Sequence, residues 1–173
     1  MDEVVTEFKS ESQEILARLT ALLEDLEEDP GRVNELDGYG QKVDRIMGGA
    51  MSLASAMDND PLLNQIGACA GLCKTVGYRG SQIPEEQGGF AKAVIGLLLD
   101  MTEMLQTMVE KVGSEKNFDL SSPLYLTVVD RLKWVSEQFQ DGTRSSLKIA
   151  GTQGTAKDFG ENINDLLKRM GVS

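Results

Sequence analysis

The sequence of 173 residues has no histidine, only two cysteines and four prolines, and aromatic residues make up 5% of it. The cysteines, Cys69 and Cys73, are spaced to lie one turn apart on the same face of a helix. A metal site there would need two further ligands, which histidine cannot supply in this chain. No glycine-rich phosphate-binding loop is present either. We therefore expect two small buried thiols, no metal site and no cofactor.

Basic charge is also scarce, because 17 lysines and arginines stand against 28 aspartates and glutamates, for a formal net charge of −11. An excess of this size repels nucleic acid and anionic membranes, so neither is expected as a partner. No apolar run approaches the roughly 18 residues that indicate a membrane-spanning helix. The first residues, MDEVVTEF, are acidic and polar, unlike a signal peptide. Together these features predict a cytoplasmic location.

Leucine, methionine and alanine carry most of the apolar surface, and they recur at helical spacing along the chain. Through residues 5–26 the apolar positions alternate steps of three and four, the pattern of a helix with one packed face. The same periodicity predicts helices over 30–56, from 61 to about 80, from 84 to about 112 and from 123 to about 139. No strand pattern occurs in the sequence, which therefore predicts an all-α fold.

Helix-breaking residues between these segments divide the chain. Proline and glycine stop the first helix at EEDPG, and Asp60 with Pro61 forms a start signal for the third. Residues 1–113 are expected to form an antiparallel four-helix bundle, followed by a fifth helix within 114–141. The small and polar residues of 142–157 predict a flexible linker. Residues 158–173, with Asp158 and Glu161 at capping-box spacing, predict a short amphipathic helix.

Two adjacent glycines, Gly48 and Gly49, lie inside the otherwise amphipathic helix predicted over 30–56. Each costs about 1 kcal/mol relative to alanine in a helix interior, so their position needs a reason. Without side chains they let another backbone approach the helix closely. Three explanations stay open: a neighbouring helix of the same chain packs there, an external partner docks there, or the glycines are relics of an earlier function.

The segment DRIMGGA, residues 44–50, and the acidic, leucine-rich first helix resemble the histidine-containing phosphotransfer (HPt) domains that open chemotaxis histidine kinases. The resemblance covers residues 1 to about 113. In that family the second helix carries a phosphorylatable histidine, then a lysine and two small residues, whereas Asp44 and Met47 stand at the histidine and lysine positions here. The resemblance thus implies an HPt-like domain that is not phosphorylated but binds the receiver domain of a response regulator. It assigns to the docking face Gln41, Asp44, Arg45, Met47, Gly48, Gly49 and Met51.

The C-terminal sequence ENINDLLKRMGV, residues 161–172, is similar to the C-terminal peptide of CheZ-type chemotaxis phosphatases and, less closely, to the N-terminal peptide of a flagellar switch protein family. In both families a short tethered helix binds a receiver domain, which implies the same partner here. Such a helix lays its apolar face in a groove of its partner. The alternative is that it folds back onto the bundle. The residues assigned to this helix are Phe159, Ile163, Asp165, Leu166, Leu167, Met170 and Val172.

Two other functions stay open. A carboxylate and a nearby amide can orient a water molecule for hydrolysis of an aspartyl phosphate, so Asp44 with Gln41 are candidates for an auxiliary phosphatase of a response regulator. Asp141, in FQDGT, resembles the aspartate in the catalytic helix of those phosphatases, but Ser145 stands where that family has the water-positioning glutamine. The other function is structural, with the fifth helix and Trp134 pairing two copies in a homodimer.

Overall fold

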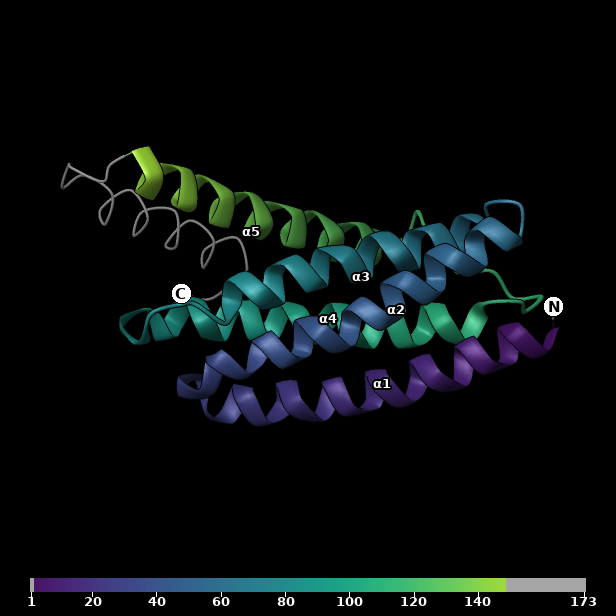
Figure 1. Ribbon diagram of the computed structural model, residues 1–173, viewed down its shortest axis with the longest axis horizontal. Helices are drawn as coiled ribbons and strands as arrows, with labels where there is room; N and C mark the ends of the chain where they lie inside the picture. Colours follow the sequence, from purple (N-terminus) through teal and green to yellow (C-terminus); the bar gives the residue numbers. More distant parts are fainter. Residues whose placement is uncertain (1, 149–173) are drawn as a thin grey trace.

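The computed structural model describes the backbone of residues 2–148 and the side chains as far as Phe139, and every regular element in that range is a helix. Successive α-helices run in alternating directions, and α5 diverges from the other four (Figure 1). None of the helices in the described range is long and apolar enough to cross a bilayer. The all-α prediction is confirmed for these residues. The elements are α1 (Asp2–Glu28), η1 (Pro30–Glu35, 3₁₀), α2 (Leu36–Ala56), α3 (Pro61–Gly80), η2 (Glu85–Gln87, 3₁₀), α4 (Gly88–Lys111) and α5 (Pro123–Lys148).

The start of α3 follows the predicted signal. The Leu63 amide donates to Asp60 Oδ1 at 3.0 Å, and Pro61 takes the first helical position, where its missing N–H has no cost. In the turn before it, Asp58 and Asn59 have positive φ angles of 52° and 60°. Short polar side chains tolerate this left-handed conformation better than most residues. The turn thereby reverses the chain between α2 and α3.

Three helix boundaries differ from the sequence prediction. Residues 30–35 form a 3₁₀ helix with a kink at Arg32, so α2 begins only at Leu36. Residues 85–87 form a second 3₁₀ helix, which places the Glu85–Glu86 pair before α4 instead of in its first turn. At the other end of the chain, α5 continues to Lys148, through the first residues of the segment predicted as a linker. Apolar periodicity does not separate a 3₁₀ turn from the first turn of an α-helix, which explains the first two differences.

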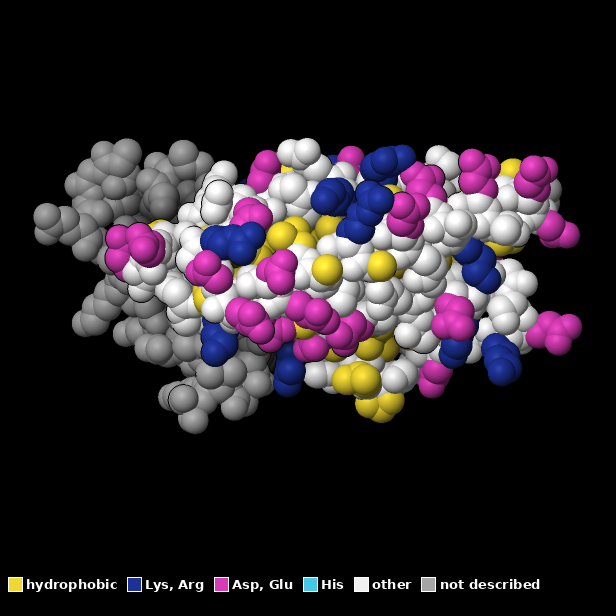
Figure 2. Space-filling model, turned by 90° about the horizontal axis from the view of Figure 1, so that it is seen from below, with side chains coloured by type: hydrophobic (Ala, Val, Ile, Leu, Met, Phe, Trp, Pro, Cys, Tyr) yellow, Lys and Arg dark blue, Asp and Glu magenta, His cyan; other side chains and the backbone are white. Residues whose placement is uncertain are grey.

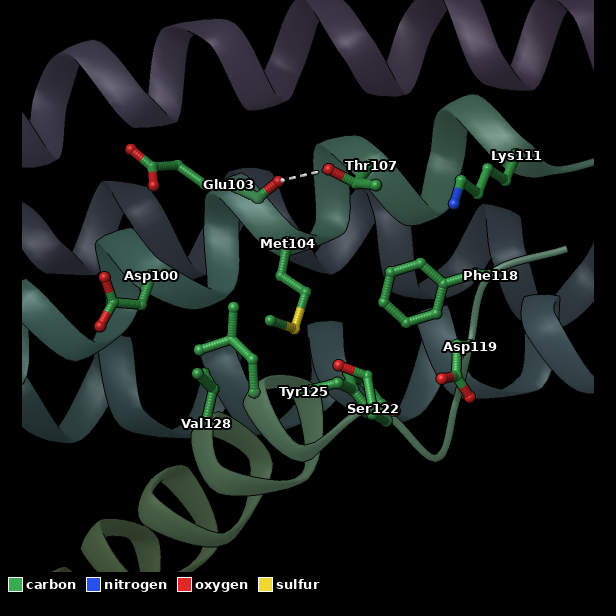
Figure 3. A pocket seen from close by; sticks show the side chains of 11 residues that line it. Asp100, Glu103, Met104, Thr107, Lys111, Phe118, Asp119, Ser122, Tyr125 and Val128 are labelled. Carbon is green, nitrogen blue, oxygen red and sulfur yellow. Dashed lines mark hydrogen bonds between the residues drawn. The ribbon is translucent and has the colours of Figure 1, made fainter. Parts of the chain in front are cut away.

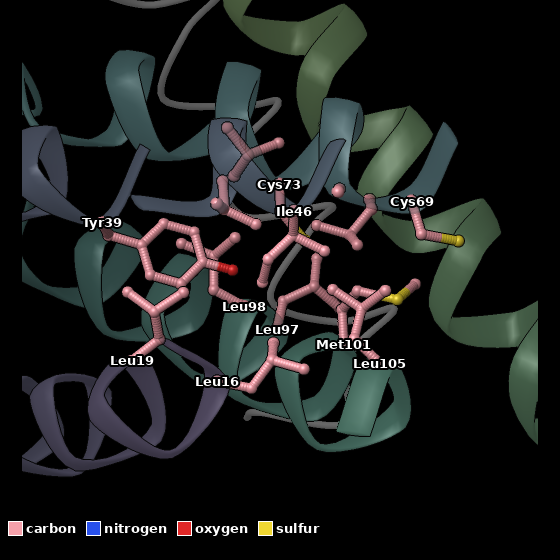
Figure 4. Close-up of a cluster of buried hydrophobic side chains, with 14 of the residues drawn as sticks. Leu16, Leu19, Tyr39, Ile46, Cys69, Cys73, Leu97, Leu98, Met101 and Leu105 are labelled. Atoms are coloured by element: carbon pink, nitrogen blue, oxygen red, sulfur yellow. The ribbon is translucent and has the colours of Figure 1, made fainter. Parts of the chain in front are cut away.

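The core lies where α1, α2, α3 and α4 face one another, and it consists largely of aliphatic side chains, with the Tyr39 ring among them (Figure 4). The Tyr39 side chain is fully buried, and its hydroxyl lies 3.0 Å from Thr102 Oγ1. Because Thr102 Oγ1 donates its own proton to the Leu98 carbonyl at 2.7 Å, Tyr39 is the donor in this pair. Both buried hydroxyls are therefore satisfied, which avoids a penalty of about 1–3 kcal/mol for an unpaired buried polar group.

Helices α2 and α3 approach closely because glycines leave side chains out of their interface. A Cβ built on Gly77 would lie 2.9 Å from the Tyr39 ring and 3.3 Å from the Leu36 carbonyl oxygen. A Cβ on Gly40 would lie 2.9 Å from the Tyr78 ring. Real Cβ atoms do not approach other atoms to 2.9 Å, so the two tyrosine rings occupy the space that larger residues would need. This close approach fixes where the outer face of α2 stands relative to α3.

Helix α5 packs against α3 and α4. Near its start, the Tyr125 hydroxyl donates to Gln65 Oε1 at 3.0 Å. The hydroxyl proton is thereby used, so the Cys69 thiol, 3.5 Å away, is the donor to the Tyr125 oxygen. Near the end of the described side chains, the rings of Phe90 and Phe139 pack with centroids 5.4 Å apart. The residues of α5 that are buried in this contact are Tyr125, Val128, Val129, Leu132, Val135, Ser136 and Phe139.

Candidate functional site

The seven residues assigned to the docking face lie on α2 and are all at least partly exposed, so the helix presents them on its outer side. Asp44, Met47 and Gly49 are half-buried. The exposed residues are Gln41, Arg45, Gly48 and Met51. Seen from below, the surface carries acidic side chains along its length with lysines and arginines between them, and hydrophobic side chains show only in small groups (Figure 2).

The two glycines differ in their surroundings. A Cβ built on Gly48 would have no atom of the described residues within 4 Å, apart from the backbone of its own helix. A Cβ on Gly49 would lie 3.2 and 3.3 Å from two atoms of the Phe8 ring on α1. Gly49 therefore makes room for an aromatic ring inside the molecule. No described neighbour explains Gly48.

Asp44 forms an ion pair with a residue that the sequence analysis did not identify. The Lys74 ammonium on α3 donates to Asp44 Oδ1 at 2.9 Å, and the side chains remain 34% and 45% exposed. This hydrogen bond raises the pKa of Lys74 above its ordinary value. The two residues lie on different helices, so no local sequence pattern links them. Only the register of α2 against α3 brings them together.

The hydrogen bond of Gln41 goes to a residue other than Asp44. The Gln41 side-chain amide donates to Asp37 Oδ2 at 3.1 Å, one turn back along α2. The Asp44 carboxylate accepts from Lys74 instead. The Gln41 amide and the Asp44 carboxylate, which the sequence suggested for water activation, are therefore both hydrogen-bonded to other residues.

Arg45 connects the docking face to α1 by donating to the Glu11 carboxylate. Both side chains are at least half exposed, so the pair contributes about 0–1 kcal/mol to stability. The position of this ion pair matters more than its energy. Arg45 and Glu11 place a positive and a negative charge along the α1 edge of the face, and Lys74 and Asp44 place another such pair along the α3 edge. Gly48 follows Asp44 by four residues and Arg45 by three, so it lies about one turn beyond both pairs on the same face of α2.

The two methionines of the face lie over glycines of α3. The Met47 sulfur lies 3.3 Å from a Cβ built on Gly71, and Met51 Cγ lies 3.0 Å from one built on Gly67. Met51 nevertheless remains 56% exposed, one of the few large apolar side chains with so much contact with water. Methionine is flexible and adapts its shape to a partner surface. The α3 glycines thus position two adaptable apolar groups beside Gly48.

A shallow groove of about 290 Å³ runs between α1 and α2 next to Gly49. Its floor is mainly apolar, and two glutamates of α1, Glu7 and Glu11, stand on its rim. The groove therefore extends the docking face toward the N-terminal half of α1. Its other lining residues are Val4, Phe8, Gly49, Ser52, Leu53 and Ala56.

Both thiols are buried, at the positions expected from their spacing. Burial raises the pKa of Cys69, and it raises the pKa of Cys73 to about 12. Such thiols are poor nucleophiles near neutral pH. The structure therefore places neither cysteine in the candidate site.

The remaining predicted site residues lie apart from this face. Trp134 on α5 is half-buried and packs against the core. Asp141 lies in the backbone of α5, but its side chain is outside the described residues. The predicted C-terminal helix is also outside them, with its assigned residues Phe159, Ile163, Asp165, Leu166, Leu167, Met170 and Val172.

Comparisons with known proteins found no match: no family model, no curated protein and no solved structure corresponds to this chain.

Proposed function

We propose that this chain is a signalling module that binds the receiver domain of a response regulator through the outer face of α2, without being phosphorylated. In this proposal the first four helices form an HPt-like bundle, and the C-terminal helix is a tethered second contact. Asp44 stands at the position of the phosphorylated histidine, and a carboxylate does not replace an imidazole as a phosphoryl carrier. The sequence contains no histidine that could take that role.

The observation that carries the proposal is the open space at Gly48. A glycine in mid-helix costs about 1 kcal/mol relative to alanine, and no described neighbour uses the space that it leaves. A partner backbone that approaches α2 closely would use it. The partner would find a bare helix surface with the exposed Met51 beside it.

The charges around Gly48 favour a polar rim for this contact. The Asp44–Lys74 pair lies on its α3 side and the Arg45–Glu11 pair on its α1 side. An apolar centre with charged groups at the edge is the usual composition of a protein interface. Each of these side chains is at least one third exposed, so the four groups can exchange partners when another protein docks.

Calorimetric titration of receiver domains into the full chain, with and without beryllofluoride, tests the proposal. Gly48→Gln introduces a good helix former and fills the open space, so we expect the Kd to rise at least about tenfold, or about 1.4 kcal/mol. The matched control is Gly38→Ala on the same helix, where an added Cβ also meets no described atom. Gly38 lies about 15 Å from Gly48 along α2. Its substitution should leave the Kd unchanged.

Two results would refute the proposal: no binding heat from any receiver domain, or equal affinity for the parent and Gly48→Gln. Leu167→Asp, in the C-terminal segment, tests the second contact separately. If the tail takes part, this variant weakens binding while the α2 face stays intact.

The phosphatase alternative has its own measurement. The lifetime of the receiver's aspartyl phosphate should be the same with the parent chain and with Asp44→Ala if the module only binds. A phosphatase that uses Asp44 would shorten the lifetime, and Asp44→Ala would restore it. Lys74→Ala serves as the matched control, because it breaks the same ion pair and leaves the carboxylate in place.

A further inference from the structure

A second and larger groove, of about 490 Å³, lies between α4, the α4–α5 connection and the first turns of α5 (Figure 3). Its lining residues come from α4, the α4–α5 connection and α5 and include none of α2, so it is separate from the docking face. Met104 points into its centre, facing Tyr125 and Val128. Asp100 and Glu103 lie at one end, and Lys111, Phe118 and Asp119 lie at the other.

The floor of this α4–α5 groove is apolar. Phe118 packs edge-on against Tyr125 with ring centroids 5.4 Å apart. Met104 and Phe118 are only half-buried, and Leu124 on the groove wall is 68% exposed. The exposed Leu124 and the half-buried Met104 and Phe118 together present apolar surface that an amphipathic helix can cover.

The rim of the groove is mainly acidic. Among the lining residues, Asp100, Glu103 and Asp119 carry carboxylates and Lys111 carries an ammonium, and the guanidinium of Arg131 acts on Asp100 from nearby. That ammonium lies 5.6 Å above the Phe118 ring, where the aromatic face holds it. An occupant with an apolar stripe and adjacent basic residues would match both the floor and the rim.

The C-terminal segment of this chain has such an apolar stripe, and its two basic residues follow three acidic ones, Asp158, Glu161 and Asp165. Its apolar residues Ile163, Leu166, Leu167 and Met170 follow i, i+3, i+4, i+7 spacing, which places them on one face of a helix. Lys168 and Arg169 stand directly beside this stripe. The apolar face would cover Met104 and Leu124, and the two basic side chains would meet the carboxylates of the rim.

The length of the chain permits the contact. From Val128 in the groove, α5 carries the chain to Lys148, about 30 Å away at 1.5 Å per residue. Residues 149–157, when extended, also span about 30 Å. These nine residues are long enough to bring residues 158–170, within the helix predicted over 158–173, back to the groove.

We propose that the α4–α5 groove is the docking site of the chain's own C-terminal helix, residues 158–170. Two occupants are possible in principle, this tail and the tail of a second copy, and the charge of the chain favours the first. Chains with a net charge of −11 repel one another, whereas a short tether holds the chain's own tail at a millimolar effective concentration. The contact does not depend on the receiver proposal. If that proposal also holds, the groove and the receiver compete for the same apolar stripe.

Paramagnetic relaxation in the full chain tests the contact. A nitroxide attached to Thr107→Cys places the label at the groove. The two native thiols are buried, so the reagent reacts with the new cysteine and not with them. We expect the amide signals of residues 158–170 to lose most of their intensity. The matched control label is on Asn34→Cys, an exposed site near Gly88 at the other end of α4, about 30 Å from Thr107. With that label the same signals should keep their intensity.

Leu167→Asp should restore the signal intensity with the Thr107 label, because a charge in the apolar stripe opposes docking. This residue is in the tail, so its substitution leaves the groove itself unchanged. Full intensity of the tail signals in the Thr107-labelled parent would overturn the proposal. A second result would also overturn it. In a mixture of isotope-labelled chain without nitroxide and nitroxide-labelled chain without isotope, broadening of the amide signals of residues 158–170 would assign the contact to a second copy. All these measurements are made without a receiver domain, so they can fail independently of the receiver proposal.

Discussion

At the residue scale, Gly48 and Gly49 show that identical neighbours can have opposite roles. At Gly49 the Phe8 ring lies where a side chain would begin, so packing within the molecule explains this glycine. Gly48 has no such reason among the described residues. Of the explanations that the sequence left open, internal packing thus applies to one glycine, and the docking proposal rests on the other.

This difference predicts the stabilities of two alanine variants. Gly48→Ala should raise the free energy of unfolding by up to about 1 kcal/mol, since alanine favours the helix and its methyl meets only solvent. Gly49→Ala should gain less or lose stability, because its methyl presses on the Phe8 ring. Urea unfolding followed by circular dichroism measures both. Equal gains would contradict the packing assigned to Gly49.

A second prediction concerns Asp100, which is exposed but partly shielded from water by its neighbours, and this desolvation raises its pKa in spite of the nearby Arg131 charge. A raised folded pKa means that the folded chain holds this proton more tightly than the unfolded chain. The resulting stability is present below the ordinary pKa and is lost as the pH rises through the raised one. Asp100→Asn should therefore become more stable relative to the parent as the pH rises from about 3 to about 6.

Urea unfolding of both proteins at a series of pH values checks this dependence. A difference in unfolding free energy that stays constant over the series, or one that shrinks with rising pH, would show that desolvation does not dominate the Asp100 environment.

At the element scale, the interface between α2 and α3 determines the candidate site. It brings Lys74 to Asp44 and places Met47 and Met51 over α3 glycines. The sequence predicted both helices and their buried faces from apolar spacing, but it did not predict the Asp44–Lys74 pair. Spacing within one helix defines which residues share a face, whereas the partner across an interface depends on register and distance, and these are set by glycines such as Gly77.

The close approach of α2 and α3 predicts a large effect for Gly77→Ala. Its methyl would meet the fully buried Tyr39 ring and the Leu36 carbonyl, neither of which can move without disturbing the core. We expect a loss of about 1–3 kcal/mol in unfolding free energy, the usual cost of overpacking. The matched variant is Gly71→Ala on the same helix, where the atom met is the flexible Met47 sulfur. Its loss should be smaller, and equal losses in chemical denaturation would argue against the close packing at Tyr39.

At the scale of the whole molecule, the all-α class was predictable because several long segments repeat the helical period without one strand pattern. The 3₁₀ segments η1 and η2 and the end of α5 were not, since periodicity is weak at helix ends. The placement of the proposed docking residues, Gln41 to Met51, on one helix was predictable from the sequence. The α1 wall of the docking face, formed by Phe8 and Glu11, required the assembled helices.

The two buried thiols have one further consequence for the molecule as a whole. Both thiols lie in the core, but Cys69 donates to Tyr125 of α5, whereas the Tyr39 side chain of α2 influences the pKa of Cys73. Different helices therefore pack against the two thiols. An alkylating reagent reaches Cys69 when α5 detaches and reaches Cys73 when the core opens. Leu132→Ala, which weakens the attachment of α5, should speed the modification of Cys69 much more than that of Cys73. Mass spectrometry of the alkylated chain would then measure two separate rates. The rate at Cys69 would report the release of α5, and the rate at Cys73 would report the opening of the core.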